Sequence, residues 1–542
     1  MSDEQSQQPI QQKDAAGTTT RGAMIISAAV ALSRVLGLAR EMVFSTLFGA
    51  SAVMSAFVVG FRIPNLLRDL FAEGALSTAF VTVFSKQTEK HGQEAAWALA
   101  NKMRSMVAVC MGLIVMLGVI FAPVLVSLLA PDWEGDQRQM TILLTRIMFP
   151  FIGLVSMAAL VMGMLNACKA FTMPALASCF FNLGSILGGV TLAWLIDPSF
   201  GPISIVGMAL GTLIGGFLQL AIQLPMTHKL GYRPRMDFQW RDSGVAHVLR
   251  LMGPAILASS AVQVNVMVNT IFATYVSEQA PALLNYAFRL MQLPLGMFGV
   301  AIATVTLPLV SRSAANENFE EFRDILARGI RFALFLAVPS ALGLIVLGEP
   351  IVSLIYERGE FTAADVPETA AALSFYALGL LGYSALKVVT PTFYALEHRF
   401  IPMIVGLISI GVNAGLNYYF IFELKLGVVG LALSTSLLAM INFLVLYFWM
   451  GGILKGLESG KLLAGLAKLA VAGAALAAAA WLGDYYLIEP FWETNLLIRI
   501  LVLLTTVGVS AGLFFLVAYL LHMDEVHQVV KLVKRKLNKV KK

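Results

Sequence analysis

Charged residues are scarce in this sequence: they make up 13% of its 542 residues, whereas 58% are hydrophobic, and the mean hydropathy is +0.79. A soluble domain of this length needs more charge to cover its surface, so the apolar excess indicates a protein that lies in a lipid bilayer. The net charge of +6 does not indicate a nucleic-acid partner, because the basic residues lie mostly in short loops and in the segment 531–542. Basic loops of this kind orient a membrane protein.

Cysteine and catalytic motifs are scarce as well. The three cysteines, Cys110, Cys168 and Cys179, form no CxxC pair, so the sequence indicates neither a disulfide framework nor a zinc site. No phosphate-loop motif is present, and the longest expected extracytoplasmic loop, at 349–368, is short for a catalytic loop. We therefore expect a transporter with no metal and no cofactor, rather than an enzyme.

Long apolar runs predict an all-α polytopic membrane protein with about fourteen transmembrane helices, since about 20 apolar residues cross the hydrocarbon core. Residues 1–21 are polar and Gln-rich, which predicts a disordered cytosolic tail rather than a signal peptide. The run at 51–85 is too long for one perpendicular span, and we expect it to leave the membrane near Gly74. The expected spans are 23–47, 51–72, 105–130, 140–165, 172–195, 203–226, 248–276, 281–310, 330–348, 368–394, 400–421, 427–450, 463–487 and 495–521.

The loops between these runs alternate in charge. Loops such as 229–250 are basic, whereas loops such as 349–368 on the other side are mainly acidic. Because basic loops stay in the cytoplasm, this alternation places both termini there, as an even number of spans also requires.

Two segments recur weakly at an offset of about 225 residues: Phe61-Arg62 corresponds to Phe288-Arg289, and 207–212 (GMALGT) to 430–435 (GLALST). Six spans per copy give a parallel repeat, whose halves typically frame a cavity and move in alternating access. The expected divisions are a tail (1–22), an N-lobe (23–228), a C-lobe (229–455), two added helices (456–521) and a basic cytosolic tail (522–542).

Ionisable residues inside the expected spans are candidate functional residues, because burying a charge in hydrocarbon is costly. The carboxylates Glu41 and Asp69 neutralise adjacent arginines in the simplest interpretation, and Glu73 is the third acidic residue. An excess of cations indicates an anionic substrate, and the planar guanidinium fork suits a diphosphate. The basic residues are Arg34, Arg40, Arg62, Arg68, Arg146, Arg289 and Lys387.

Some of these residues have simpler explanations than others. Arg146 is expected at a helix end, where it needs no cavity, whereas Arg34, Arg289 and Lys387 have no acidic neighbour in sequence. The span interiors of the second half lack carboxylates, which disfavours a cation-coupled drug exporter. Asn413 and Asn417, four residues apart, indicate either hydrogen bonds between helices or a cation site.

Two long segments resemble the signature of a known family. Ser33-Arg-Val-Leu-Gly-Leu-Ala-Arg40 and 61–77 (FRIPNLLRDLFAEGALS) are similar to motifs of the MurJ (MviN) lipid II flippases, in the multidrug/oligosaccharidyl-lipid/polysaccharide exporter superfamily. The expected number of spans matches that family too. Shorter matches occur at 253–257 (GPAIL), 269–273 (NTIFA), 286–291 (YAFRLM) and 299–301 (GVA).

The resemblance implies a V-shaped transporter whose two lobes enclose a cationic cavity. It implies movement of lipid II, an undecaprenyl-pyrophosphate-linked disaccharide-pentapeptide for peptidoglycan synthesis, from the inner to the outer leaflet of the bacterial cytoplasmic membrane. Arg34, Arg40, Arg68 and Arg289 match the family's essential arginines, and 456–521 would form a groove for the polyprenyl tail. Implied partners are the lipid precursor, membrane lipids and the cell-wall synthesis machinery.

The candidate substrate-binding residues are Arg34, Arg40, Arg62, Arg68, Arg289 and Lys387, with Glu73, Gln292 and Ser55 in support. The chain departs from the family, whose members often have Asp at Ser55 and Phe288 and Glu at Gln292. These departures make the cavity more positive and leave the headgroup and any ion coupling open. The alternatives are a flippase for another polyprenyl-linked polysaccharide and a cation-coupled drug exporter.

Overall fold

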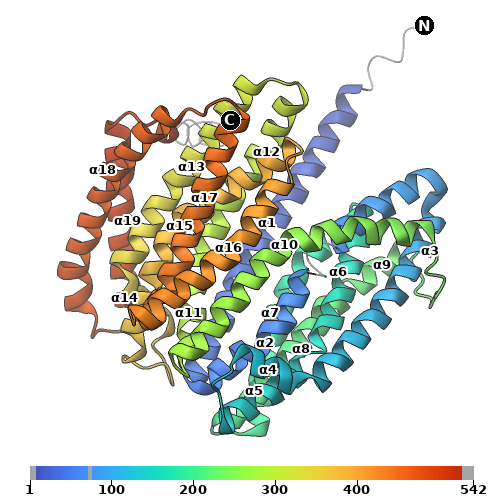
Figure 1. Ribbon diagram of the computed structural model, residues 1–542, viewed down its shortest axis with the longest axis horizontal. Helices are drawn as coiled ribbons and strands as arrows, with labels where there is room; N and C mark the ends of the chain where they lie inside the picture. Colours follow the sequence, from blue (N-terminus) through green and yellow to red (C-terminus); the bar gives the residue numbers. More distant parts are fainter. Residues whose placement is uncertain (1–7, 71–75, 528–542) are drawn as a thin grey trace. The chain divides into compact units, whose positions relative to one another are not determined.

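The computed structural model describes residues 8–70 and 76–527. Every regular element in this part of the chain is a helix (Figure 1). Among the described residues, eleven helical stretches are long and apolar enough to cross a membrane, or twelve if the two limbs of the bent helix α10 (Ser243–Val276) count as one span. The all-α polytopic architecture is thus confirmed, but the expected number of about fourteen spans is not. At the second expected span, α2 (Ala52–Leu67) has only 16 residues.

The chain divides into two compact units, and unit 1 covers Met1–Gln263. The helix α1 begins well before the expected start of the first span, so residues 8–22, which we expected to be disordered, are helical. The span expected at 105–130 is the end of one long helix together with a short one. Besides α2 and the first part of α10, the described helices are α1 (Gln8–Phe48), α3 (Ser77–Ile120), α4 (Ala122–Leu129), α5 (Gly135–Met148), α6 (Phe151–Ala167), α7 (Thr172–Ile196), α8 (Ile205–Ala221) and α9 (Leu224–Lys229).

Helices α7 and α8 lie side by side in unit 1 with their backbones in close contact (Figure 1). A Cβ atom at Gly207 would lie 2.2 Å from the backbone nitrogen of Ala193, and one at Gly211 would lie 2.3 Å from the Cα of Gly189. Small residues permit such an approach, which lets membrane helices gain packing contacts that lipid cannot supply. Part of the repeated motif 207–212 therefore has a packing role.

The loop between α9 and α10 lies against α3. The side chain of Asn101 accepts hydrogen bonds from the Tyr232 hydroxyl and the Arg235 backbone nitrogen, each at 2.9 Å. Lys102 Nζ lies 2.7 Å from Asp242 Oδ2, and burial raises the pKa of the Tyr232 phenol. The basic loop expected in the cytoplasm is therefore held to unit 1 at several points.

Unit 2 covers Val264–Lys542. Most of its helices begin and end close to the expected spans. Two depart: α13 begins at Phe319 rather than at the expected 330, and the short α14 lies where we expected an acidic loop. A π-helical turn, Leu295–Gly299, separates α11 from α12. The helices are α11 (Ala280–Pro294), α12 (Val300–Ala315), α13 (Phe319–Val346), α14 (Gly348–Tyr356), α15 (Asp365–Ala395), α16 (Phe400–Tyr418), α17 (Gly427–Ile453), α18 (Ser459–Gly483) and α19 (Leu496–Leu520).

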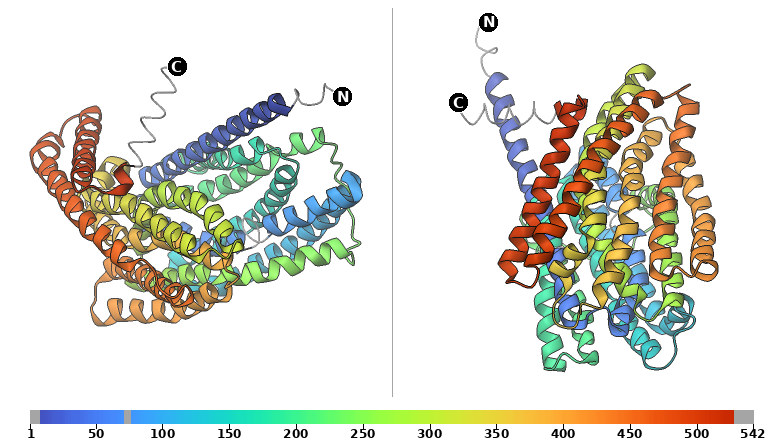
Figure 2. Two further views of the ribbon diagram at one scale, coloured as in Figure 1. Left: turned by 90° about the horizontal axis from the view of Figure 1, so that it is seen from above. Right: turned by 90° about the vertical axis from the view of Figure 1, so that its left-hand side faces the viewer.

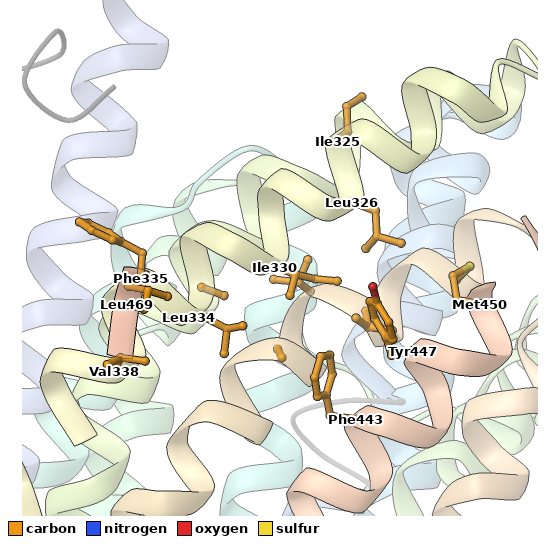
Figure 3. Close-up of a cluster of buried hydrophobic side chains, with 14 of the residues drawn as sticks. Ile325, Leu326, Ile330, Leu334, Phe335, Val338, Phe443, Tyr447, Met450 and Leu469 are labelled. Atoms are coloured by element: carbon orange, nitrogen blue, oxygen red, sulfur yellow. The ribbon is translucent and has the colours of Figure 1, made fainter. Parts of the chain in front are cut away.

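The core of unit 2 is built around α13. Ile330 and Phe335 of this helix lie in one buried cluster with Phe443 of α17 and Leu469 of α18 (Figure 3). The ring of Phe335 lies 5.4 Å, between centroids, from that of Phe514 in α19. Helices α18 and α19 also run beside each other (Figure 2). The two helices beyond the expected repeat are thus part of the hydrophobic core of unit 2.

The two units meet in sequence within α10, between Gln263 and Val264. The expected boundary at 228/229 lies earlier, and the loop held by Asn101 explains why the following segment belongs to unit 1. The limbs Ser243–Pro254 and Ser259–Val276 of α10 enclose a bend of 51°. Pro254 removes a backbone hydrogen bond just before this bend. The internal repeat stays a prediction.

Candidate functional site

Arg40 of α1 is paired with its neighbour in sequence, as its adjacency to Glu41 indicated. Its Nη2 lies 2.9 Å from Glu41 Oε1, and Glu41 is buried. The guanidinium carbon lies 5.4 Å from the ring centroid of Phe181 in α7, a cation–π contact. Arg40 is therefore held between a carboxylate and an aromatic face, and the aromatic partner could not be predicted from sequence spacing.

Arg68 caps the end of α2 and is also paired. Its Nη2 lies 2.7 Å from Asp69 Oδ1, and the amide of Gln263 in α10 donates to Asp69 Oδ2 at 3.1 Å. Gln263 was not among the expected site residues, because nothing in its local sequence connects it with Asp69. Glu73, expected to support this set, lies outside the described residues.

Three other arginines of unit 1 differ in their surroundings. Arg34 is half-buried in α1, and no hydrogen bond or ion pair joins it to another described residue. Arg62 is half-buried in α2. Arg146 is exposed near the end of α5, and its Nε donates to the carbonyl of Val119. The geometry of Arg146 agrees with the helix-end interpretation.

In unit 2, Arg289 of α11 and Lys387 of α15 are both exposed. The Cγ of Lys387 lies near Gly299, so its stem follows the π-helical turn. Phe288 packs its ring against Tyr376, with centroids 5.3 Å apart. Gln292, one turn after Arg289, is half-buried. The aromatic residue that replaces the family's frequent Asp therefore supports α15 rather than adding charge beside Arg289.

Ser55 lies in α2 and is fully buried. Its backbone nitrogen donates to the carbonyl of Ser51 within the first turn of the helix. We expected Ser55 to support substrate binding, but a side chain with no exposed surface cannot contact a substrate in this conformation.

Asn413 and Asn417 lie in a buried hydrogen-bond network within unit 2. Both side chains donate to Oδ1 of Asn269 in α10, at 2.9 and 2.8 Å, and Asn417 also accepts from Ser434 in α17. Asn269 Nδ2 in turn donates to Thr435 at 3.0 Å. This is the arrangement expected of hydrogen bonds between helices, and cation binding at these two residues stays a prediction.

Among the described residues, no group of three or more His, Cys, Asp or Glu side chains is arranged to hold a metal ion. The side chains described above offer guanidinium and ammonium groups, carboxylates that pair with them, and amides. The fold and these side chains define the class of protein: a multi-pass α-helical membrane transporter.

Comparison with known proteins identifies the family within this class. A model of the family described as lipid II flippase MurJ matches residues 44–503. The probable lipid II flippase MurJ of Vibrio cholerae is 35% identical over 477 residues, which cover 85% of this chain and 88% of the relative. Lipid II flippase MurJ of Burkholderia cenocepacia is 34% identical, and the aligned region covers 79% of this chain and 83% of that relative. The chain belongs to the MurJ family of lipid II flippases.

Solved structures agree with this membership. A lipid II flippase MurJ in an inward closed conformation matches with a TM-score of 0.74 at 26% identity, covering 91% of this chain and 99% of its own. An inward-facing multidrug resistance MATE transporter of the MOP superfamily matches with a TM-score of 0.67 at 14% identity, covering 80% and 98%. At that identity the second match shows the fold alone. The family predicted from the motifs at 33–40 and 61–77 is confirmed.

Proposed function

We propose that this protein moves lipid II, a polyprenyl-diphosphate-linked peptidoglycan precursor, from the inner to the outer leaflet of the bacterial cytoplasmic membrane. The observation that carries the proposal is the family match over residues 44–503, together with curated relatives that are themselves named lipid II flippases. The cationic side chains on α1, α2, α11 and α15 support it. A diphosphate is the part of such a lipid that these side chains suit best.

Four of the six basic residues fall into two kinds. Arg40 and Arg68 are paired with adjacent carboxylates, so a substrate anion must replace or share that partner. Arg34 and Lys387 have no ion pair with another described residue, so they offer charge without such competition. We assign diphosphate binding to Arg34, Arg40, Arg62, Arg68, Arg289 and Lys387, with Gln292 as an amide donor to the headgroup.

Transport follows an alternating-access mechanism in this proposal, with both termini in the cytoplasm as the charge of the loops indicates. The exposed apolar surface of α18 and α19 binds the polyprenyl tail: Leu497 and Leu504 are 78% and 64% exposed. In this proposal the protein moves its substrate unchanged, in keeping with its membership of a flippase family. Cell-wall synthesis enzymes use the product on the far side.

The test is complementation of a bacterial strain depleted of its own lipid II flippase. The wild-type chain should restore growth and cell shape, and purified protein in vesicles should expose labelled lipid II on the opposite leaflet. A chain that restores only the export of another polyprenyl-linked polysaccharide would contradict the assignment of the headgroup.

A further inference from the structure

The Asp69 carboxylate binds two partners through its two oxygens. Oδ1 accepts hydrogen bonds from Arg68 Nε at 3.0 Å and from Arg68 Nη2 at 2.7 Å. Oδ2 accepts from Gln263 Nε2 at 3.1 Å. The terminal torsion of Asp is soft, so a donor on one oxygen determines the direction in which the other oxygen points. Gln263 therefore orients Oδ1 toward the guanidinium.

Such orientation is needed because Arg68 and Asp69 are adjacent in sequence. Neighbouring residues on a helical turn point in different directions and do not face each other by default. The pair of Arg40 and Glu41 has the same spacing, but the Glu41 side chain is only 5% exposed, so the surrounding protein fixes it. The Asp69 side chain is 26% exposed and lacks that constraint.

We propose that Gln263 is a positioning residue, whose amide holds Asp69 against Arg68 until an anionic headgroup replaces the carboxylate. The proposal rests on the proposed function for its transport step, but the hydrogen-bond chain itself is independent of substrate. Gln263 lies on the second limb of α10, far in sequence from the pair that it orients.

Loss of the amide should leave Asp69 free to rotate and Arg68 less shielded. An anionic headgroup then meets less competition, so it binds more tightly and leaves more slowly. The expected signature in transport is a parallel decrease of KM and kcat, by about two- to tenfold, which corresponds to one hydrogen bond of ordinary net strength. A general loss of folded protein would lower kcat alone.

The first measurement needs no substrate. Purified full-length protein is treated with phenylglyoxal, which modifies accessible guanidinium groups, and the modification rate at Arg68 is followed by peptide mass spectrometry. Gln263→Leu should raise this rate about three- to tenfold. Asp69→Asn should raise it at least as much, and adding Gln263→Leu to Asp69→Asn should raise it no further.

The matched control is Gln223→Leu, because Gln223 is a buried glutamine of unit 1 whose side chain donates to the carbonyls of Gln219 and Ala158. Its substitution should leave the rate at Arg68 unchanged. If Gln263→Leu does not insert, Gln263→Asn serves instead, since it keeps the amide but is one methylene too short. An unchanged rate, or equal acceleration with and without the Asp69 carboxylate, would overturn the positioning role.

The second measurement is lipid II movement in vesicles over a range of substrate concentrations. Gln263→Leu should lower KM and kcat together, whereas wild-type values would overturn the role of Gln263 in transport. The variant Arg68→Ala tests the binding of the headgroup by Arg68 separately from the positioning role of Gln263. Wild-type transport by Arg68→Ala would remove Arg68 from headgroup binding, while the phenylglyoxal result on Asp69 and Gln263 would still decide the hydrogen-bond chain.

Discussion

Asn417 donates a hydrogen bond of 2.8 Å to Asn269, and the two residues belong to different helices, α16 and α10. Asn413, one turn away, donates to the same oxygen, and Asn269 donates onward to Thr435 of α17. Asn413 and Asn417 are fully buried. Hydrogen bonds of this kind hold membrane helices together, because lipid offers their polar groups no alternative partner.

Replacing Asn269 should therefore destabilise unit 2. Asn269→Leu removes three hydrogen bonds between helices. At about 0.6 kcal/mol each, their loss should lower the free energy of unfolding by about 2 kcal/mol. Thermal unfolding in detergent measures this as a lower Tm. Asn265→Leu is the graded control, since Asn265 makes one side-chain hydrogen bond, to Ser409. Equal Tm values for the two variants would contradict the role of Asn269 as the centre of the network.

The contact between α7 and α8 predicts a strong effect of one methyl group. Gly211→Ala places a Cβ atom 2.3 Å from the Cα of Gly189, so the two helices must separate. We expect the free energy of unfolding to fall by about 1–3 kcal/mol, since overpacking forces backbone shifts. Gly411→Ala, in open space on α16, should be neutral or slightly stabilising. The yield of folded protein after solubilisation is measured for both glycine variants and compared.

The core of unit 2 predicts what the last two helices contribute to stability. Phe514→Ala should cost about 3–5 kcal/mol, because Phe514 is fully buried in the cluster around α13. Leu504→Ala, on the exposed side of α19, should cost little in detergent. The structure also indicates that truncation after Met450 would uncover part of this cluster. Unfolding curves of Phe514→Ala and Leu504→Ala that coincide would show that α19 is not part of the core.

The sequence alone was sufficient for most helix positions and for the family. Apolar runs such as 172–195 and 495–521 match α7 and α19 within one or two residues, because the length that lipid requires constrains them strongly. The short α14 was missed because the acidic residues around it indicated a loop. The bend in α10 was missed because it does not change the hydropathy of the run that contains it.

Pairings between distant segments could not be predicted. The adjacency of Arg40 and Glu41 in sequence predicted their ion pair. The four-residue spacing of Asn413 and Asn417 predicted that both amides lie on the same face of one helix. Their partners Phe181 and Asn269 lie on other helices, which sequence spacing cannot identify. The burial of Ser55 was missed for the same reason: the side of α2 that faces the protein depends on which helices pack against it.

Arg34 should be essential for transport but not for folding. It is half-buried, and no other described residue forms an ion pair with it, so its loss leaves no carboxylate stranded. We expect Arg34→Ala to insert normally and to fail in complementation, and Arg34→Lys to rescue partly, because charge returns without the planar fork. Arg146→Ala, which removes an exposed helix-end arginine, should complement. Normal growth on Arg34→Ala would remove Arg34 from the mechanism.

The membrane potential should drive the return of the empty transporter. Net positive charge near the substrate is drawn toward the negative cytoplasmic side by about 2.3 kcal/mol per charge per 100 mV fully traversed. The cations cross only part of the membrane field when the transporter changes conformation. Several cations together therefore contribute roughly 1–3 kcal/mol to the return of the empty transporter. Bound diphosphate cancels this charge, which lets the loaded form open outward without a coupled ion.

Vesicles with an imposed potassium diffusion potential provide the test. The rate of lipid II movement should rise with a potential that is negative on the cytoplasmic side, and Lys387→Gln should make this dependence less steep because it removes one exposed cation of α15. Lys461→Gln is the matched control, since Lys461 pairs with Glu458 at the beginning of α18. It should leave the slope unchanged. A rate that does not depend on potential in the wild-type protein would refute this resetting step, because the cations would then move through no part of the field.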